Sequence, residues 1–326
     1  MHPEQILKAI DELWELTQNP RKPASEIINE YTRSRRYIGS KDRKAITNGV
    51  WDKWRKKDYP LWLKDKIPNF EKEWLAMQST QAPTVLRANG NRDEIKKRLS
   101  DEGIETKITE KSPLGLLLEK RANLSPLNTF KEGLIEVQDE GSQLIGLAVG
   151  VKPNERILEL CAGAGGKSLL FAQIMQNKGR IVASDISEKS LEELKKRASR
   201  AKISIIETTL NIPNEKFDAV VIDAPCSGTG TYRRAPDNVH KLTSEQFDKI
   251  KATQKMLLEK AIDYVAPNGR ICYMTCSLTK DENEEQIMEF LKEHPELSFV
   301  SQEHFTPATT DTDGFYIATI KKNFPI

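Results

Sequence analysis

The chain has 326 residues, of which 38% are hydrophobic and 30% charged, and its formal net charge is +2 at pH 7. This composition is typical of a folded globular protein of two or three domains, and it excludes a disordered chain. No apolar run approaches the roughly 18 residues of a membrane span, and residues 1–13 lack the pattern of a signal peptide. We therefore expect a cytoplasmic protein without a membrane contact.

Residues 1–78 are predicted to form a helical domain. Apolar side chains recur there at the spacing of an α-helix with one buried face. Pro20 and Pro23 separate the first two helices. The expected helices cover 3–19, 24–34 and 41–57, with shorter pieces at 61–66 and 70–77.

Residues 79–135 are predicted to form a small α+β module. Short apolar runs typical of strands flank one polar stretch that favours a helix. We expect strands at 83–90, 104–110 and 115–120, and a helix at 91–103.

Residues 136–326 are predicted to form an α/β domain, because strands there alternate with helices. This alternation is typical of a parallel sheet with helices on both faces. The expected strands are 156–160, 180–185, 203–207, 217–223 and 270–275, and the expected helices are 167–177, 187–200 and 244–265. The segment 314–322 offers one more strand, expected at an antiparallel edge.

A glycine-rich turn, "LELCAGAGGKS" at 158–168, follows the first of these strands. Such a turn lets a ligand approach bare backbone amides at a helix N-terminus. A phosphate-binding P-loop would need glycine where Cys161 stands, which disfavours a nucleoside triphosphate. Asp185, 22 positions after Gly163, is placed to bind both hydroxyls of a ribose. S-adenosylmethionine fits this pattern, and a tight structural turn beside a solvated Asp185 is the alternative.

Two of the four cysteines follow strand-like segments. Cys226 comes three residues after the strand 217–223, and Cys276 directly follows 270–275. The carboxyl ends of parallel strands meet at one edge of the sheet, so both thiols would reach the crevice of the glycine turn if these strands are neighbours. Cys272 is expected in the core, and simple burial is the alternative for the other two as well. The chain has no C-x-x-C pair and its histidines are scattered, so no metal site is expected.

Cytosine methylation would give two cysteines separate roles. Carbon 5 of cytosine is a poor nucleophile until a thiolate adds to carbon 6 and converts the ring to an enamine. Asp223 lies at the end of its strand. If protonated, it would donate a hydrogen bond to the ring nitrogen edge of the cytosine; otherwise it would accept one from the exocyclic amine. Afterwards the carbon 5 proton must leave, and a second thiol would act as a base during release.

Four segments resemble the RsmB/NSUN (Fmu/Sun) family of RNA cytosine-5 methyltransferases, and most of all its RsmB-like members. They are "LELCAGAGGKS", "DAPCSGTGTYRRAPD", "MTCSLTKDENEEQI" and "DGFYIATIKK", and the similarity covers about 133–326. The resemblance implies a Rossmann-like class I methyltransferase sheet with S-adenosylmethionine as cofactor. It also implies that Cys276 attacks the base, that Cys226 aids release, and that Lys167 reaches the reaction centre.

The resemblance assigns the cofactor contacts as well. The residues it implies are Cys161, Ala162, Gly163, Ala164, Gly165, Gly166, Lys167, Asp185 and Asp223. Two positions depart from the family pattern. Ala164 stands where proline is usual, and Thr209 stands where the family has an acid near the adenine, so a hydroxyl is expected to serve there.

The first two units resemble other parts of RsmB-type proteins. Residues 1–78 are similar to a shortened NusB-like helical domain, and 79–135 to an RRM-like module. By analogy these similarities favour 16S ribosomal RNA over transfer RNA as the substrate.

A basic segment at 31–66 supports an RNA partner. It holds twelve Lys or Arg against four Asp, a local net charge of +8. The expected phosphate ligands are Arg33, Arg35, Arg36, Arg43 and Lys44, with Arg233 and Arg234 on the loop after Cys226. Trp51 and Trp54 are expected in the helical core. The target base should lie in an RNA loop or be flipped out of a helix.

Two other functions remain open at this point. A non-catalytic RNA-binding or assembly factor would keep the fold without the chemistry, and the departure at Thr209 is the feature that favours it. DNA cytosine methyltransferases use the cysteine of the P-C pair for attack, which would make Cys226 the nucleophile. We expect a monomer.

Overall fold

The computed structural model describes residues 1–19, 21–67 and 77–323. Within residues 1–19 and 21–67 the helices are α1 (Pro3–Thr17), α2 (Ala24–Ser34), α3 (Ser40–Arg55) and α4 (Leu61–Lys64). The predicted piece at 70–77 lies outside the described residues except for Met77. The buried faces of α1, α2 and α3 form one apolar cluster around Leu13, Ile28, Ile46, Val50 and Trp54. Trp51 packs against this cluster, as expected.

A four-stranded antiparallel sheet follows, in the order β2-β3-β1-β4. Its strands are β1 (Val85–Ala88), β2 (Thr106–Ile108), β3 (Gly115–Leu118) and β4 (Ile135–Val137), accompanied by α6 (Arg92–Asp101) and α7 (Asn128–Lys131). The Asn91 side chain caps α6 by accepting from the backbone amides of Asp93 and Glu94. Because β4 pairs with β1, this sheet reaches residue 137, slightly beyond the expected limit of 135. The division into three units stays a prediction.

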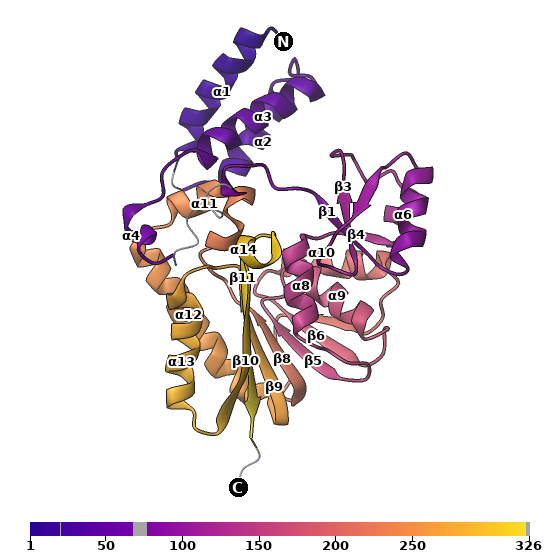
Figure 1. The fold of residues 1–326 in the computed structure, drawn as a ribbon, viewed down its shortest axis with the longest axis vertical. Coiled ribbons are helices and arrows are strands. Elements are labelled where there is room, and N and C mark those ends of the chain that lie inside the picture. Colours follow the sequence, from indigo (N-terminus) through magenta and orange to yellow (C-terminus); the bar gives the residue numbers. More distant parts are fainter. Residues whose placement is uncertain (20, 68–76, 324–326) are drawn as a thin grey trace.

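The third part is a seven-stranded sheet in the order β10-β11-β9-β8-β5-β6-β7 (Figure 1). Its strands are β5 (Arg156–Leu160), β6 (Arg180–Ser184), β7 (Ile206–Thr209), β8 (Phe217–Asp223), β9 (Val265–Thr275), β10 (Leu297–Phe305) and β11 (Phe315–Lys322). Strands β5 to β9 run parallel to one another, and β10 and β11 are antiparallel to their neighbours. This confirms the Rossmann-like α/β prediction and the antiparallel direction of the last strand. Its expected place at the edge is wrong, because β10 pairs with the outer side of β11 and forms the edge itself.

Helices accompany this sheet along the chain. They are α8 (Glu140–Ala148), α9 (Gly166–Ile174), α10 (Glu188–Arg200), α11 (Pro236–Lys241), α12 (Ser244–Tyr264), α13 (Glu284–Glu293) and α14 (Pro307–Thr310). Two short 3-10 turns cover Thr229–Arg234 and Lys280–Glu282. None of the described helices is both long and apolar enough to cross a bilayer.

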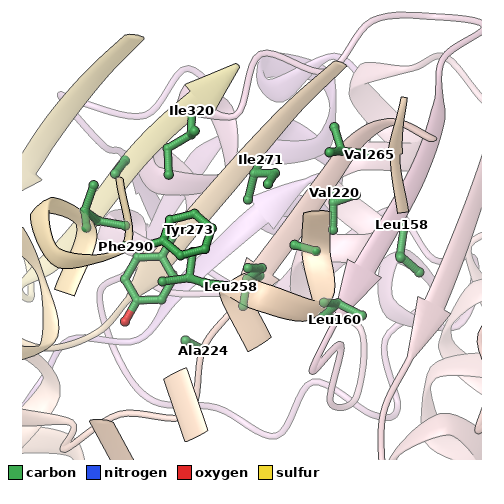
Figure 2. Close-up of a cluster of buried hydrophobic side chains, with 14 of the residues drawn as sticks. Leu158, Leu160, Val220, Ala224, Leu258, Val265, Ile271, Tyr273, Phe290 and Ile320 are labelled. Carbon is green, nitrogen blue, oxygen red and sulfur yellow. The ribbon is translucent and has the colours of Figure 1, made fainter. Parts of the chain in front are cut away.

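The two faces of the seven-stranded sheet bury separate apolar clusters. Ile271 and Tyr273 of β9 pack with Leu258 of α12 and Phe290 of α13 (Figure 2). Successive side chains of a strand point to opposite faces, so Cys272 lies in the other cluster, where it is fully buried. The prediction that Cys272 is a core residue is confirmed.

The helical part is attached to the sheet domain through α11. The backbone amide of Ala24 donates to Asp237 Oδ2 at 2.8 Å, and Lys241 Nζ donates to the Lys22 carbonyl at 2.7 Å. The indole of Trp54 stacks on His240, with ring centroids 5.5 Å apart. Because α11 follows the loop of Cys226, these contacts hold the helical part beside that loop.

Candidate active site

Strands β8 and β9 are parallel neighbours, with Asp223 opposite Met274 in the register. The loops that leave their carboxyl ends therefore start side by side. Cys226 Sγ and Cys276 Sγ lie 3.0 Å apart, and the backbone amide of Cys276 donates to Cys226 Sγ at 3.3 Å. The structure thus brings the two cysteines together, as the neighbouring strands require.

The surroundings make the two thiols inequivalent. The hydrogen bond from Cys226 lowers the pKa of Cys276, outweighing burial, and Thr231 and Lys167 add to this effect. The hydrogen bond to Cys276 and burial raise the pKa of Cys226, and the charge of Glu282 raises it further. Because the two pKa values are shifted in opposite directions, Cys276 is the first of the pair to ionise and Cys226 keeps its proton longer.

Lys167 and Asp223 form an ion pair next to the cysteines. Lys167 lies in the first turn of α9, and its Nζ is 2.7 Å from Asp223 Oδ2. Burial alone would lower the pKa of Lys167, but the charge and the hydrogen bond of Asp223 raise it. A carboxylate paired with an ammonium group accepts hydrogen bonds, so the ion pair favours the acceptor role of Asp223 over the donor role.

Glu282 joins the two cysteine loops, and the sequence analysis missed it. Its side chain is fully buried. It accepts from the Ser227 amide at 2.8 Å, from Thr279 Oγ1 at 2.9 Å and from Gln254 Nε2 at 3.0 Å. The hydroxyls of Ser227 and Ser277 also donate to it. The serine after each cysteine therefore has a structural purpose, because both serines bind one buried carboxylate.

A third loop closes against the same place. The Gly230 amide donates to the Cys276 carbonyl at 2.9 Å, and the Gly314 amide donates to the Gly230 carbonyl at 2.8 Å. A Cβ atom on Gly230 would lie 2.2 Å from the Gly314 carbonyl oxygen, so no other residue fits without a backbone shift. A Cβ atom on Gly314 would in turn lie 2.9 Å from Gly230 Cα, and this close approach accounts for the glycine of "DGFYIATIKK" just before β11.

The glycine turn lies at the carboxyl end of β5. Gly163 and Gly165 have φ angles of 55° and 81°, and Cys161 shares the left-handed region at 59°. Asp185 Oδ2 accepts from the Gly163 amide and Oδ1 accepts from the Ser187 amide, both at 2.8 Å. Each oxygen keeps a lone pair for a further donor. Asp185 thus binds the turn itself, which the sequence did not reveal.

Other residues of the predicted cofactor set surround this turn. A Cβ on Gly166 would meet no heavy atom within 4 Å, whereas Ala162 is buried. The Ala164 carbonyl accepts from Arg197. Ile186, next to Asp185, is an exposed apolar side chain that the sequence analysis missed, although an apolar residue directly after a strand-end acid was its signal.

Thr209 ends β7, but its hydroxyl is engaged locally. It donates to the Asn211 carbonyl at 2.6 Å and accepts from the Asn211 amide at 3.0 Å. A hydroxyl oxygen has two acceptor positions, so one remains for an adenine amine. The contact expected of Thr209 stays a prediction.

The predicted RNA ligands divide into two groups. Arg33, Arg36, Arg43 and Lys44 are exposed. Arg35 stacks on the Tyr31 ring at 3.5 Å and pairs with Glu12 at 3.1 Å. Their role toward RNA stays a prediction.

The role predicted for Arg233 requires a correction. Arg233 Nε is 2.6 Å from Asp313 Oδ1, and both residues are buried. Its guanidinium group therefore stabilises the loops around the site, and the sequence could not show this because Asp313 lies about 80 positions away. Arg234 also pairs with Asp313 and with Asp139, but it is an exposed residue. Its role toward RNA stays a prediction.

A cavity of about 680 Å³ opens onto the two cysteines. It is lined by Cys226 and Cys276, and by basic residues of segment 21–23, α11 and α12.

Among the described residues, Glu259, Glu293 and His294 bring possible metal ligands within 4.8 Å of one another. Lys255 already pairs with Glu293 at 2.9 Å, so we assign no ion there.

The chain is similar to several known proteins. The family model "16S rRNA methyltransferase RsmB/F" matches residues 147–321. The probable ribosomal RNA small subunit methyltransferase B of Bacillus subtilis is 30% identical over 74% of this chain and 60% of its own length. The ribosomal RNA small subunit methyltransferase B of Proteus mirabilis is 31% identical over 81% of this chain and 66% of its own. The chain thus spans just under two thirds of these relatives.

Solved structures are similar as well. The structure of PH0851 superposes with a TM-score of 0.77 at 27% identity, over 92% of this chain and 76% of that one. NSun6 from Pyrococcus horikoshii shares the fold, with a TM-score of 0.66 at 18% identity, over 74% of this chain and 90% of that one. Since the family model covers more than half of the sequence, including the glycine turn and both cysteine loops, the chain belongs to the RsmB/F family of 16S rRNA methyltransferases.

Proposed function

We propose that the protein transfers a methyl group from S-adenosylmethionine to carbon 5 of a cytosine in 16S ribosomal RNA. The observation that carries this proposal is the pair of sulfurs 3.0 Å apart, beside an ion pair between Asp223 and Lys167, the residue that directly follows the glycine turn. Family membership and the names of the relatives support methyl transfer to small-subunit RNA. A cytoplasmic location is part of the proposal, since ribosomal RNA is found there.

The residues present fit S-adenosylmethionine. The oxygens of Asp185 keep lone pairs for two ribose hydroxyls, and exposed Ile186 offers an apolar surface for a base. Gly163 and Gly166 leave open space where a Cβ would stand. When bound, S-adenosylmethionine would supply the methyl group as an electrophilic carbon on a sulfonium. None of these contacts needs a phosphate group on the ligand, and the P-loop glycine is missing at Cys161. Both points favour the methyl donor over a nucleoside triphosphate.

In the proposed reaction, Cys276 acts first. Its thiolate adds to carbon 6 of the cytosine, a C–S bond forms, and the electron pair of the 5,6 double bond moves to carbon 5, which takes the methyl group. Asp223 would accept a hydrogen bond from the exocyclic amine and hold the ring in place. Lys167 orients Asp223 through the ion pair, and its positive charge also favours the attacking thiolate.

Cys226 acts second. Before attack, its proton stabilises the Cys276 thiolate. Once Cys276 is bonded to carbon, its negative charge is gone and Cys226 ionises more easily. The Cys226 thiolate then removes the carbon 5 proton, the C–S bond breaks, the double bond is restored, and Cys276 leaves as a thiolate.

The proposed function is tested by identifying the nucleoside that the protein methylates. Purified protein, labelled S-adenosylmethionine and an unmodified 16S rRNA transcript are expected to give 5-methylcytidine, measured by nucleoside mass spectrometry, with bisulfite sequencing to locate the base. A transfer RNA transcript serves as the comparison substrate. Label on another nucleoside, or none on RNA while the cofactor binds, would favour a different modification or a non-catalytic factor.

A further inference from the structure

We propose that segment 21–23 of the helical part forms the outer wall of the entrance to the two cysteines, and that this groove binds the phosphates of single-stranded RNA next to the target cytosine. This inference rests on the proposed function, and it adds which side chains hold the RNA backbone beside the target cytosine. The groove is the cavity of about 680 Å³ described above, with both catalytic sulfurs in its lining.

Segment 21–23 is held in place by the sheet domain. On one side, the Ala24 amide donates to buried Asp237 at 2.8 Å. On the other, Lys241 Nζ donates to the Lys22 carbonyl at 2.7 Å and pairs with Asp237 at 3.5 Å. The wall is therefore fixed relative to α11 and to the loop of Cys226.

The charge of the lining fits a polyanion. Its basic side chains are Arg21, Lys22, Lys241 and Lys249, and its one acid is Asp237. Asp237 is already bound to the Ala24 amide and Lys241, so it offers no free charge to a phosphate. The groove is strongly basic although the whole chain has a net charge of only +2.

Three of the basic side chains, Arg21, Lys22 and Lys249, are free to exchange partners, whereas Lys241 is bound to Asp237. Arg21 is exposed and has no ion-pair partner within the described ranges. Lys249 pairs with Glu245 on the helix surface, where both are more than 70% exposed, and Lys22 pairs with Glu30. Exposed pairs of this kind contribute about 0–1 kcal/mol, so a phosphate can replace the carboxylate at little cost.

The shape and the chemistry of the groove favour a single strand. Its lining, drawn from the described residues, includes no aromatic ring, so bases are not held there by stacking. Apolar contacts come from Pro23, Leu242 and Ile250, which suit sugars and base edges. A duplex would keep its bases away from the sulfurs. We therefore expect backbone binding that tolerates different sequences around the target.

The test measures how RNA binding depends on salt. The double variant Arg21→Ala/Lys249→Ala is compared with wild type, using a short single-stranded oligocytidine as probe and fluorescence anisotropy at several salt concentrations. The logarithm of the RNA association constant falls linearly with the logarithm of the salt concentration. For single strands, each lost phosphate contact reduces the steepness of this line by about 0.7, so the double variant should be less steep than wild type by about 1.4. Lys178→Ala, an exposed lysine in the turn before β6 at the opposite edge of the sheet, is the matched control and should keep the wild-type slope.

A second measurement uses the unaltered protein. An acetylating reagent should modify Lys249 less in the presence of the oligocytidine than in its absence, while Lys178 is modified equally in both. An unchanged salt slope in the double variant, or equal modification of Lys249, would overturn the proposal. Binding of polyglutamate as tight as that of RNA would overturn its choice of partner.

The outcomes separate this inference from the proposed function. If wild type forms 5-methylcytidine but the double variant binds RNA unchanged, the function stands and the groove is wrong. If the slope falls as expected but wild type forms no 5-methylcytidine, the groove stands and the proposed function is wrong.

Discussion

Replacing Cys226 with alanine is expected to leave the protein covalently attached to its RNA. Cys276 can still add to the base, but the group that removes the carbon 5 proton is missing, so the C–S bond breaks only slowly and the adduct accumulates. Loss of such a base lowers turnover by about 10²–10⁴-fold. A retarded band on a denaturing gel, present with S-adenosylmethionine and RNA and removed by nuclease, measures the adduct.

The matched variants define the roles. Cys276→Ala and the variant that lacks both thiols, Cys226→Ala/Cys276→Ala, should form no adduct. Cys272→Ala, which alters a buried core thiol, should turn over without a trapped species. An adduct with Cys276→Ala and none with Cys226→Ala would reverse the assignment and match the pattern of DNA cytosine methyltransferases.

Replacing Glu282 with alanine is expected to disorder both cysteine loops. Five donors, from Ser227, Ser277, Thr279 and Gln254, would lose their acceptor in a fully buried place. Buried unsatisfied donors cost about 1–3 kcal/mol each before relaxation, so we expect a loss of about 3 kcal/mol or more in the free energy of unfolding. Thermal or urea unfolding measures this loss, and Glu285→Ala, an exposed acid on α13, should change stability little.

Glu282→Gln separates charge from packing. The negative charge of Glu282 raises the pKa of Cys226, so the neutral side chain should let Cys226 ionise at lower pH. The rate of alkylation of Cys226 by iodoacetamide, followed by peptide mass spectrometry, should therefore rise at a lower pH than in wild type. If Glu282 only held the loops in place, Glu282→Gln would leave the pH profile of Cys226 alkylation unchanged. Glu285→Gln is the control and should keep the wild-type profile.

The parallel sheet and the meeting of the two cysteines followed from the sequence. Strand periodicity located β5, β6, β8 and β9, and the rule that parallel strands present their carboxyl ends at one edge then placed the sulfurs together. The expected strand at 203–207 was wrong in its limits, since β7 covers Ile206–Thr209. Ile203 and Ile205 are partly buried against the core and so imitate a strand.

Other features could not be read from the sequence. The edge strand β10 is mostly exposed and lacks a regular apolar alternation, so it was not predicted. The preceding α13 was also not predicted, although its buried Ile287 and Phe290 stand at helical spacing and were its signal. Glu282 lies 55 positions from Ser227, and only the packed loops show that they are bonded. The same is true of segment 21–23, which reaches the cysteines because the helical part is attached through α11.

The central claim is that Cys276 is the nucleophile in RNA cytosine methylation. RNA that carries 5-fluorocytidine tests it most directly, because fluorine on carbon 5 cannot leave as a proton and the adduct persists. After digestion with protease and nuclease, mass spectrometry should find the modified nucleotide, with its added methyl group, on the peptide that contains Cys276. Two results would contradict the account. One is attachment of the nucleotide to the peptide that contains Cys226. The other is no attachment by a preparation that methylates unmodified RNA with S-adenosylmethionine.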